Sequence, residues 1–585
     1  MLILGLNAYH ADAAAAIYRD GKLVAAVAEE RLNRIKHCAG FPALAVREVL
    51  RIAGATLGDV DEVAIARDST ANLKQRLGYV LRNITGVARA AQKRLQDRAG
   101  LKGLDVQLVE ACGATKKQLR AKIKRVEHHL SHAASSFFHS PFERAAILTL
   151  DGFGDFASTL NATGEGNAIS PMSRVFYPHS LGMLYTTICQ FIGFDRYGDE
   201  GKVMGLAPLG EPRFVGEFKR LLRLTPEGFE LDLACFTHHT EGVVMGADEY
   251  GSPSYGHFFS PALEKLFGAP RKRGDEITQR DKDIAASLQL RLEQAFVHLA
   301  TLLQHKTQLT DLCLAGGVAL NGVANGKLLE QTPFKRIYIH PAAGDDGTAV
   351  GSAAYLSHAK HKEARHQVQH AYWGSAFDDA EIKREIDKLN ADEVEVRALD
   401  ESTLMKETAK DIFAGKVVGW FQGAMEWGPR ALGNRSIVAH PGHPQMKQIL
   451  NARIKHREPF RPFAPSILAE KLSDYFESDH ESPFMLMVYR TRPAKYAELC
   501  AVDHVDHTGR VQTVTSTQNR KYHALIKEFG RLSGTPVVLN TSFNENEPIV
   551  CTPGEALNCF LRNGMDTVAL GNHLVRRRGN ITSVS

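Results

Sequence analysis

The sequence predicts an α/β protein of two domains, the first of them built from a duplicated lobe. Its 585 residues exceed what one hydrophobic core usually serves. Two glycine-rich strand–turn–strand units, one at the N-terminus and one at residues 145–168, indicate the duplication, with a chance likeness of two hairpins as the alternative. The polar stretch 357–370 lacks a clear apolar face. We therefore expect domains at 1–360 and 372–585.

The N-terminal unit begins with the apolar strand LILGLNA, the turn YHAD and the run AAAAIYRDGKLVAAVAEE. Asp20-Gly21 between apolar runs predicts a tight hairpin. Residues 145–168 give a related pattern, an apolar strand that ends at Asp151, followed by a glycine-rich turn and a second strand. The backbone N–H groups of Gly152 and Gly154 are expected to face the phosphates of a nucleotide.

A long amphipathic helix is predicted over residues 281–306, where apolar residues recur at helical spacing. The following DLCLAGGVALNGVANGKLLE is typical of a strand, a turn at Gly316-Gly317 and a helix. This order places helix N-terminal amides beside a backbone that a ligand can approach closely, as a nucleotide site requires. Gly316, Gly317 and Asn321 are the predicted nucleotide contacts there.

The segment HHLSHAASSFF carries the sharpest chemical signal. His128 and His132 are four residues apart, so on a helix they share one face and can ligate one metal ion. Asp151 and either Asp345 or Asp346 follow predicted strands and can complete the site. Two imidazoles and two carboxylates suit Fe²⁺, Mn²⁺ or Zn²⁺ better than Mg²⁺. A structural histidine pair is the alternative.

Two basic loops in the second domain, GPRALGNRSIVAHP and NARIKHREPFRPFAP, predict an anion site, with a solvated surface as the alternative. Glycine and proline tie the cations to loops, which can converge on one phosphate or carboxylate. The polar end of the strand VVLNTSFN suits ligand contact or a simple turn. The candidate residues are Arg430, Arg435, Lys455, Arg457, Arg461, Arg520 and Asn540.

Composition excludes several classes of protein. No apolar run approaches the length of a membrane helix, and the N-terminus lacks a basic leader, so we expect a cytoplasmic protein. The eight cysteines form no CxxC pair, which argues against a disulfide framework and a zinc ribbon. Residues 67–125 contain 15 Lys or Arg against 4 Asp or Glu and look helical. We interpret them as a solvated face, or as a surface for an anionic substrate or partner.

Taken together, these motifs resemble the NodU/CmcH family of O-carbamoyltransferases, which modify nodulation factors and antibiotics. The resemblance covers nearly the whole chain in family order. It is carried by LGLNAYHADAAAA, AEERLNRIKH, HHLSHAASSFF, LDGFGD, YGDEGKVMGLAP, LAGGVALNGVAN, GDDGTAVG, GPRALGNRS, NARIKHREPFRPFAP and LNTSFN. It implies an actin/Hsp70-like N-terminal domain, similar to the Kae protein of tRNA threonylcarbamoylation, and a YrdC-like C-terminal domain.

The resemblance also implies a reaction in two steps. The YrdC-like domain would make carbamoyl-adenylate from ATP and carbamoyl phosphate, and the N-terminal domain would pass the carbamoyl group to a hydroxyl of a small-molecule natural product. The implied metal ligands are His128, His132, Asp151 and Asp345, with Fe²⁺ expected before Mn²⁺ or Zn²⁺. The implied carbamoyl-phosphate contacts are Arg430, Lys455, Arg461 and Arg520, and then Arg435 and Arg457.

Roles in the transfer step are hypotheses that follow from the chemistry of the residue types. His10 is our candidate for the general base, since a neutral imidazole suits that task near pH 7. Lys36 would support the same pocket with its positive charge. Glu200, in YGDEGKVMG, is expected to line the nucleotide or acceptor cleft, with an ordinary loop as the alternative.

Three other functions fit the sequence less well. Hydrogenase maturation uses similar domains but adds an acylphosphatase-like domain and CxxC motifs, which this sequence lacks. Threonylcarbamoyl transfer to tRNA has only the basic segment in its favour, so we expect no nucleic-acid partner. A nucleotide-binding regulator of the actin/Hsp70 type would have no use for a second anion site. The expected partner is a small molecule with an acceptor hydroxyl, and we expect no contact with a membrane. A homodimer is compatible with this function.

Overall fold

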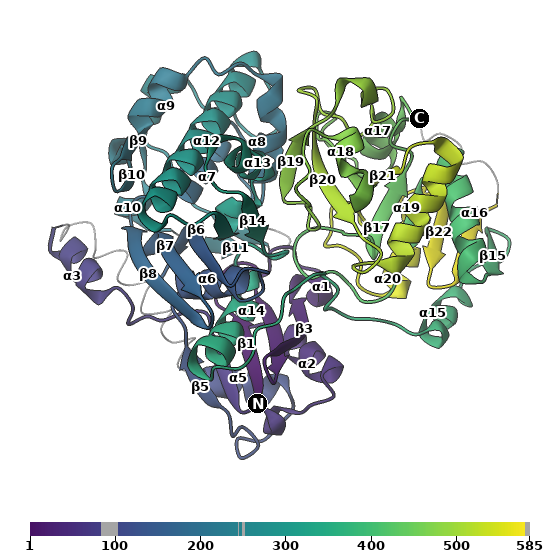
Figure 1. The fold of residues 1–585 in the computed structure, drawn as a ribbon, viewed down its shortest axis with the longest axis horizontal. Helices are drawn as coiled ribbons and strands as arrows, with labels where there is room; N and C mark the ends of the chain where they lie inside the picture. The colour runs from purple at the N-terminus through teal and green to yellow at the C-terminus, as the bar shows by residue number, and fades with distance from the viewer. Residues whose placement is uncertain (83–102, 244, 248–251, 579–585) are drawn as a thin grey trace. The chain divides into compact units, whose positions relative to one another are not determined.

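The computed structural model describes residues 1–82, 103–243, 245–247 and 252–578. The chain divides into two compact units, unit 1 (Met1–Val368) and unit 2 (Gln369–Ser585). Both combine sheets with helices, which confirms the α/β class (Figure 1). None of the helices in the described part of the chain has the length and apolar content needed to cross a bilayer.

Unit 1 contains two five-stranded sheets with the same topology. The first has the order β3-β2-β1-β4-β5 and the second the order β8-β7-β6-β13-β14. In each sheet the first three strands form an antiparallel meander and the other two run parallel to the first. This repetition confirms the duplicated lobe. The strands are β1 (Leu2–Asn7), β2 (Ala14–Arg19), β3 (Lys22–Ala28), β4 (Glu62–Ile65), β5 (Lys122–Arg125), β6 (Arg144–Gly154), β7 (Ala157–Glu165), β8 (Ala168–Phe176), β13 (Asp311–Ala315) and β14 (Arg336–Ile339).

The two predicted hairpins differ in detail. Asp20 and Gly21 have φ of 49° and 81°, the positive values that a two-residue turn of type I′ requires, so the first hairpin is confirmed. In the second lobe the strand does not end at Asp151. It continues to Gly154 after an irregularity in the ladder, and the turn lies at Asp155 and Phe156.

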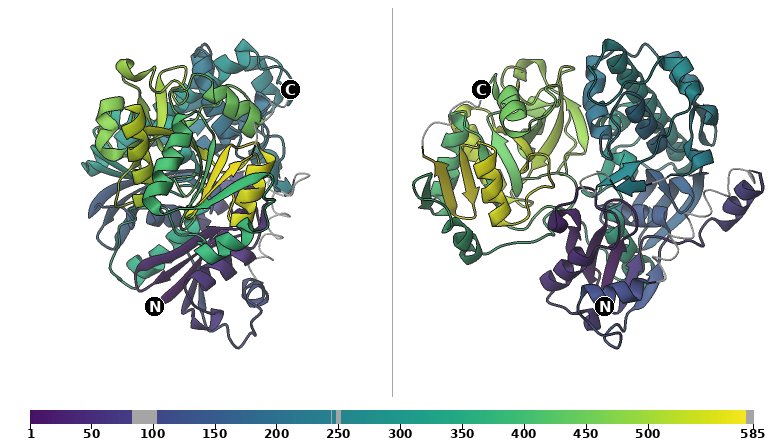
Figure 2. Two further views of the ribbon diagram at one scale, coloured as in Figure 1. Left: turned by 90° about the vertical axis from the view of Figure 1, so that its right-hand side faces the viewer. Right: turned by 180° about the vertical axis from the view of Figure 1, so that it is seen from behind.

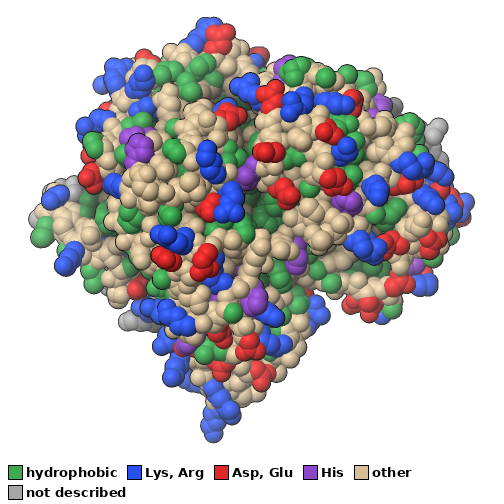
Figure 3. Space-filling view, viewed as in Figure 1, with side chains coloured by type: hydrophobic (Ala, Val, Ile, Leu, Met, Phe, Trp, Pro, Cys, Tyr) green, Lys and Arg blue, Asp and Glu red, His purple; other side chains and the backbone are tan. Residues whose placement is uncertain are grey.

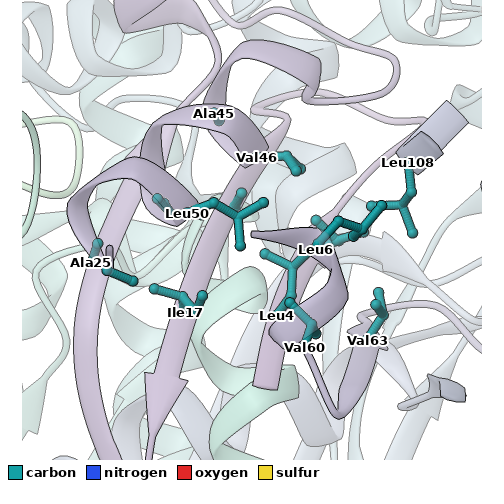
Figure 4. Close-up of a cluster of buried hydrophobic side chains, with 14 of the residues drawn as sticks. Leu4, Leu6, Ile17, Ala25, Ala45, Val46, Leu50, Val60, Val63 and Leu108 are labelled. Atoms are coloured by element: carbon teal, nitrogen blue, oxygen red, sulfur yellow. The ribbon is translucent and has the colours of Figure 1, made fainter. Parts of the chain in front are cut away.

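The core of the first lobe lies between its sheet and two helices (Figure 4). Leu4 and Leu6 of β1 and Ile17 of β2 meet Leu50 of α2 (Ala43–Ile52) and Leu108 of α5 (Leu104–Ala111). All five side chains are buried. Each such burial stabilises the fold by about 1.5–3 kcal/mol.

Helix α14 (Gly347–Ala354) packs between β1 and α6 (His128–Phe137) and is buried along its whole length. Its small residues allow backbone to approach backbone. A Cβ at Gly5 of β1 would lie 2.0 Å from the carbonyl oxygen of Ala349, and one at Gly351 would lie 1.8 Å from that of Ser131. The loop before α14 and the helix α6 are therefore held at a fixed separation, which positions the site described below.

The predicted helix over 281–306 is confirmed as α12 (Gln279–Thr307). Thr278 and Asp281 form a capping box at its start. It packs against α7 (Leu181–Phe191), α9 (Val215–Leu221) and α13 (Gly322–Gln331), and Figures 1 and 2 show it running along the second lobe. The remaining elements of unit 1 are α1 (Glu30–Asn33), α3 (Leu73–Arg82), α8 (Glu200–Leu206), β9 (Leu222–Thr225), β10 (Gly228–Leu231), α10 (His238–Glu241), β11 (Met245–Ala247), β12 (Pro253–Tyr255) and α11 (Pro261–Phe267).

The described part of the basic segment 67–125 is only partly helical. Helices α3 and α5 agree with the prediction, and residues 83–102 lie outside the described part of the chain. Residues 122–125 were predicted as helix and are instead the edge strand β5, exposed throughout and parallel to β4. Pairing with the distant strand β4 makes this segment a strand. Its lysine and arginine side chains disfavour pairing of the free edge with another chain. Lys and Arg side chains gather at the lower tip of the view in Figure 3, where the first sheet lies.

Unit 2 is built on a nine-stranded sheet of order β15-β23-β22-β16-β17-β21-β18-β20-β19. Helices α16 (Glu401–Phe413) and α19 (Arg520–Ser533) pack on it over a core that includes Trp420 and Phe529. Its other elements are α15 (Asp379–Ile386), β15 (Val394–Ala398), β16 (Val418–Phe421), β17 (Arg435–Ala439), α17 (Met446–Ile449), β18 (Ala464–Leu468), α18 (Leu472–Tyr475), β19 (Met487–Arg490), β20 (Thr508–Val514), β21 (Val537–Ser542), α20 (Pro553–Arg562), β22 (Thr567–Leu570) and β23 (His573–Arg577).

Two buried histidines, His139 and His340, are expected to make unit 1 sensitive to mild acid. Burial lowers the pKa of both, that of His340 to about 4, and their rings lie 5.2 Å apart, so each cation would also repel the other. Unfolding restores pKa values near 6.5, so the unfolded chain binds more protons below that pH and stability falls as pH falls. The loss approaches about 1.4 kcal/mol per pH unit for each histidine.

Urea unfolding between pH 7.5 and 5 measures this loss. His340→Gln should reduce the dependence on pH in that window. An unchanged slope in the variant would show that these imidazoles do not carry the effect.

Candidate metal centre and anion site

Four side chains from three segments of unit 1 meet at one point. His128 and His132 come from α6, Asp151 from β6 and Asp345 from the loop before α14. The Nε2 atom of His128 lies 3.0 Å from Asp151 Oδ2 and 3.1 Å from His132 Nε2, while His132 Nε2 lies 3.4 Å from Asp345 Oδ1. One ligand atom from each residue lies within 4.8 Å of the other three. We call this set the metal quartet.

The charges in the quartet are those of a cation site. Burial acts to lower the pKa of His128, but the hydrogen bond with Asp151 and the charge of Asp345 raise it to about 9. Burial acts to raise the pKa of Asp151, but hydrogen bonds from His128 and His132 hold it well below its usual range. Positive charge is thus required among these carboxylates, and a divalent ion can supply it in place of protons. Two nitrogens and two oxygens fit Fe²⁺, Mn²⁺ or Zn²⁺.

Two of the glycines expected to face a nucleotide lie against the quartet. A Cβ at Gly154 would overlap the His128 ring, at 1.9 Å from its nearest atom. The backbone N–H of Gly317 donates to Asp151 Oδ1 at 2.8 Å and so orients that carboxylate. The glycine-rich turns therefore leave room for the His128 ring and hold the Asp151 carboxylate.

The other two glycines bring backbone close to backbone. Gly316 has φ of 95°, and a Cβ there would lie 2.1 Å from the carbonyl oxygen of Leu150. Gly152 lies against Gly182: a Cβ added at Gly182 would lie 2.8 Å from the backbone nitrogen of Gly152. Both contacts pack the strand that carries the carboxylate of the quartet against its neighbours.

His10 lies at the edge of the quartet. Its Nδ1 atom is 3.3 Å from Asp345 Oδ2, and its ring meets that of His128 edge-on at 5.7 Å. The side chain is 22% exposed, so an incoming group can reach it. Lys36 is exposed, and its charge acts on Glu30 and His37.

Glu200 and Asn321 also have defined partners. Glu200 begins α8 and accepts a hydrogen bond from Thr186 Oγ1 at 2.6 Å, and burial raises its pKa. Asn321 caps α13 by accepting from Ala324 N at 3.0 Å, and its Nδ2 donates to Gln289 Oε1. The predicted strand, turn and helix are present around Asn321, separated by a short 3₁₀ turn at Gly317–Leu320.

Four guanidinium groups form a second cluster, in unit 2. Burial and the charge of Arg461 lower the pKa of Arg430 to about 10 and that of Arg457 to about 9. Burial and the charges of the other three lower the pKa of Arg510 well below its usual range. Arg430, Arg457 and Arg510 form no ion pair with any described residue. A set of mutually repelling cations of this kind calls for a bound anion. We call it the arginine cluster.

Arg510 was missing from the candidates because it stands alone in the strand TGRVQTV, outside both basic loops. The signal that could have found it is the alternation of side chains between the two faces of the strand. Arg510 and Gln512 are two residues apart on β20 and so face the same side. Gln512 Oε1 accepts from Asn540 Nδ2 at 2.9 Å, which ties this face to the predicted polar strand end.

Two predicted anion contacts have other partners in the structure. The guanidinium of Arg435 donates to the backbone oxygens of Gln422, Asn434, Ser375 and Gly423 and lies 3.6 Å from the centre of the Phe421 ring. These four hydrogen bonds hold the loop, and the role of Arg435 as an anion contact stays a prediction. Arg520 is 71% exposed and pairs with Glu401, which is not part of the arginine cluster.

Lys455 and Asn540 connect the loops around the arginine cluster. Lys455 Nζ is buried and donates to the oxygens of Ser542 and Asn544 at 2.6 and 2.7 Å. Asn540 Nδ2 donates to Ala431 O, beside Arg430, at 3.1 Å. The polar strand end is thus packed against the first basic loop.

A buried carboxylate shapes that basic loop. Glu426 Oε1 accepts hydrogen bonds from the backbone N–H groups of Leu432, Asn434 and Arg435 at 2.7–3.0 Å. The segment GPRALGNR is therefore wrapped around a fixed charge. Its fold follows from Glu426, four residues before Arg430, rather than from the arginines themselves.

Comparison with known proteins gives matches over nearly the whole chain. The family profile for the carbamoyltransferase N-terminus matches residues 2–354, and that for the carbamoyltransferase C-terminus matches residues 409–577. An uncharacterised protein of Synechocystis is 39% identical, with 98% of this chain and 96% of that protein covered. The nodulation protein NolNO of Sinorhizobium fredii is 38% identical, with coverages of 98% and 80%. The 3′-hydroxymethylcephem-O-carbamoyltransferase of Streptomyces clavuligerus is 34% identical over 63% of each chain.

Proposed function

The chain belongs to the carbamoyltransferase family, and from this premise we propose that it is an ATP-dependent O-carbamoyltransferase that works in two steps. The predicted enzyme class, a carbamoyltransferase, is thereby confirmed. The observation that carries the two-step proposal is the presence of two separate sites, the metal quartet in unit 1 and the arginine cluster in unit 2.

In unit 2 the arginine cluster would bind the phosphate of carbamoyl phosphate. Guanidinium forks match phosphate oxygens in pairs, and an anion would relieve their mutual repulsion. Lys455 and Asn540 would line the same site. Water would cleave carbamoyl phosphate to carbamate and inorganic phosphate. A carbamate oxygen would then attack the α-phosphorus of ATP, which gives carbamoyl-adenylate and releases pyrophosphate.

In unit 1 the metal quartet would hold a divalent ion, for which we propose Fe²⁺, with Mn²⁺ or Zn²⁺ as alternatives. Such an ion supplies charge that stabilises the phosphate of departing AMP. The nucleotide would lie beside the glycine-rich turns at Gly152–Gly154 and Gly316–Gly317. His10 would take the proton of the acceptor hydroxyl as its oxygen attacks the carbamoyl carbon.

The acceptor would be a hydroxyl group on a small natural product, in the cytoplasm. Two relatives support this class of acceptor, since their names refer to nodulation and to a hydroxymethylcephem. A purely nucleotide-binding regulator would have no role for four clustered arginines, and a tRNA substrate has only the basic segment 67–125 in its favour.

Replacing His10 by asparagine is expected to separate the two steps. Transfer should fall by about 10²–10⁴-fold, the usual contribution of a general base, while adenylate formation should continue. Transfer is followed as AMP release, with a panel of sugars and nucleosides as acceptors, and with water where none of these reacts. Adenylate formation is followed as carbamoyl-phosphate-dependent ATP–pyrophosphate exchange. A fully active variant would remove His10 from the mechanism.

A further inference from the structure

A hydrogen-bonded set of three side chains holds the turn that carries His10. Asp12 lies two residues after it, and Asp12 Oδ1 accepts from His37 Nδ1 at 2.7 Å. Asp12 Oδ2 accepts from the hydroxyl of Tyr197 at 3.2 Å. His37 belongs to the first lobe and Tyr197 precedes α8 of the second lobe. One carboxylate therefore joins three segments of unit 1.

The imidazole of His37 is itself held by its surroundings. Its backbone N–H donates to Glu30 Oε2 at 2.7 Å, and its ring lies 4.8 Å from that of Tyr197. Gly198 has φ of 86°, and a Cβ there would lie 2.6 Å from His37 Nε2. A side chain at Gly198 would displace the ring, so the Tyr197–Gly198 pair is shaped to receive it.

The turn that carries His10 has an unfavourable backbone. Tyr9 and Asp12 have φ of 68° and 58°, a region that costs residues other than glycine about 1–3 kcal/mol each. Asn7 Nδ2 stabilises the turn by donating to the carbonyl oxygens of Ala11 and Asp12 at 3.1 and 2.8 Å. A conformation of this kind persists only where several contacts define it, and the side chain of Asp12 supplies two of them.

The ligand atoms of Asp12, Glu30 and His37 also lie within 4.8 Å of one another, as in a metal site. Their hydrogen bonds favour another role. Both oxygens of Asp12 already have donors, Glu30 Oε2 accepts from His37, and Glu30 Oε1 pairs with Arg31. These contacts already give each carboxylate hydrogen-bond donors from the protein itself.

We propose that Asp12, held by His37 and Tyr197, is a positioning residue that sets His10 against Asp345. We call the three residues the Asp12 latch. Because Tyr197 belongs to the second lobe, the latch makes the orientation of His10 depend on the fit between the two lobes. The proposal rests on the proposed role of His10 as the general base of the transfer step.

Asp12→Asn and Tyr197→Phe test the latch. Asp12→Asn is expected to lower kcat for transfer by about 10²-fold, the effect of a small misplacement of a catalytic group. Tyr197→Phe removes one hydrogen bond and should lower it by about 10-fold. Neither variant should change KM for the acceptor or the rate of carbamoyl-phosphate-dependent ATP–pyrophosphate exchange. Transfer is measured as AMP release, with the best acceptor of the sugar and nucleoside panel and with water.

Tyr9→Phe is the matched control. It removes a hydroxyl from the same turn, which donates to Gln107 at 2.8 Å, and should leave kcat unchanged. Full activity of Asp12→Asn, or an equal loss in Tyr9→Phe, would overturn the latch. Loss of one bound metal equivalent in Asp12→Asn would instead assign the cluster as a metal site. Absence of exchange in the wild type would count against the proposed function and not against the latch.

Discussion

His132→Ala is expected to lower carbamoyl transfer by about 10³-fold while leaving ATP–pyrophosphate exchange unchanged, because a bound metal contributes several kcal/mol to the transfer step alone. The side chain is fully buried and its Nε2 atom faces His128, Asp151 and Asp345. Removing it deletes one ligand and leaves two carboxylates close together with less positive charge between them. The metal content of the purified protein should fall in parallel.

His129→Gln is the control for this experiment. His129 lies on the same helix and is equally buried, but its Nδ1 pairs with Thr149 Oγ1 at 2.7 Å instead of joining the quartet. The control should keep both metal and transfer. If His132→Ala retained its metal and full transfer, the quartet would not be the centre of the second step.

Arg510→Ala is expected to raise KM for carbamoyl phosphate in the exchange reaction by about 100-fold. A charge-assisted hydrogen bond to phosphate contributes about 1.5–3 kcal/mol, and this position faces three further cations. The substitution should not lower the melting temperature, because it relieves repulsion in the free protein. KM and thermal unfolding together separate loss of binding from loss of fold.

Arg520→Ala provides the contrast. The Arg520 side chain lies at the surface on Glu401, so the exchange kinetics should match those of the wild type. A large rise in KM for Arg520→Ala, with none for Arg510→Ala, would contradict the arginine cluster as the carbamoyl-phosphate site. It would instead support Arg520, the contact that the sequence predicted.

Signals that arise within one segment could be read from the sequence. His128 and His132 share a helix face because of their spacing, and the Asp20–Gly21 hairpin follows from the φ values that its turn requires. The long helix α12 follows from its apolar period. In each case the residues that decide the structure lie within a few positions of one another.

Signals that depend on distant partners could not be read in this way. Arg430 and Arg435 stand in one motif, yet the first joins the arginine cluster and the second holds backbone oxygens. Residues 122–125 carry charges typical of a surface helix but pair with β4, some sixty residues earlier in the chain. The glycines near Asp151 stay predicted phosphate contacts, and the structure adds that Gly154 and Gly317 also shape the metal quartet. Only the tertiary fold distinguishes these roles.

The most direct test of the account is ATP–pyrophosphate exchange by the purified wild-type protein, with and without carbamoyl phosphate. The account predicts exchange that depends on carbamoyl phosphate, because the adenylate must form before any transfer. Exchange without carbamoyl phosphate, or none in its presence despite ATP binding, would contradict the adenylate-forming step and leave the arginine cluster without its proposed substrate.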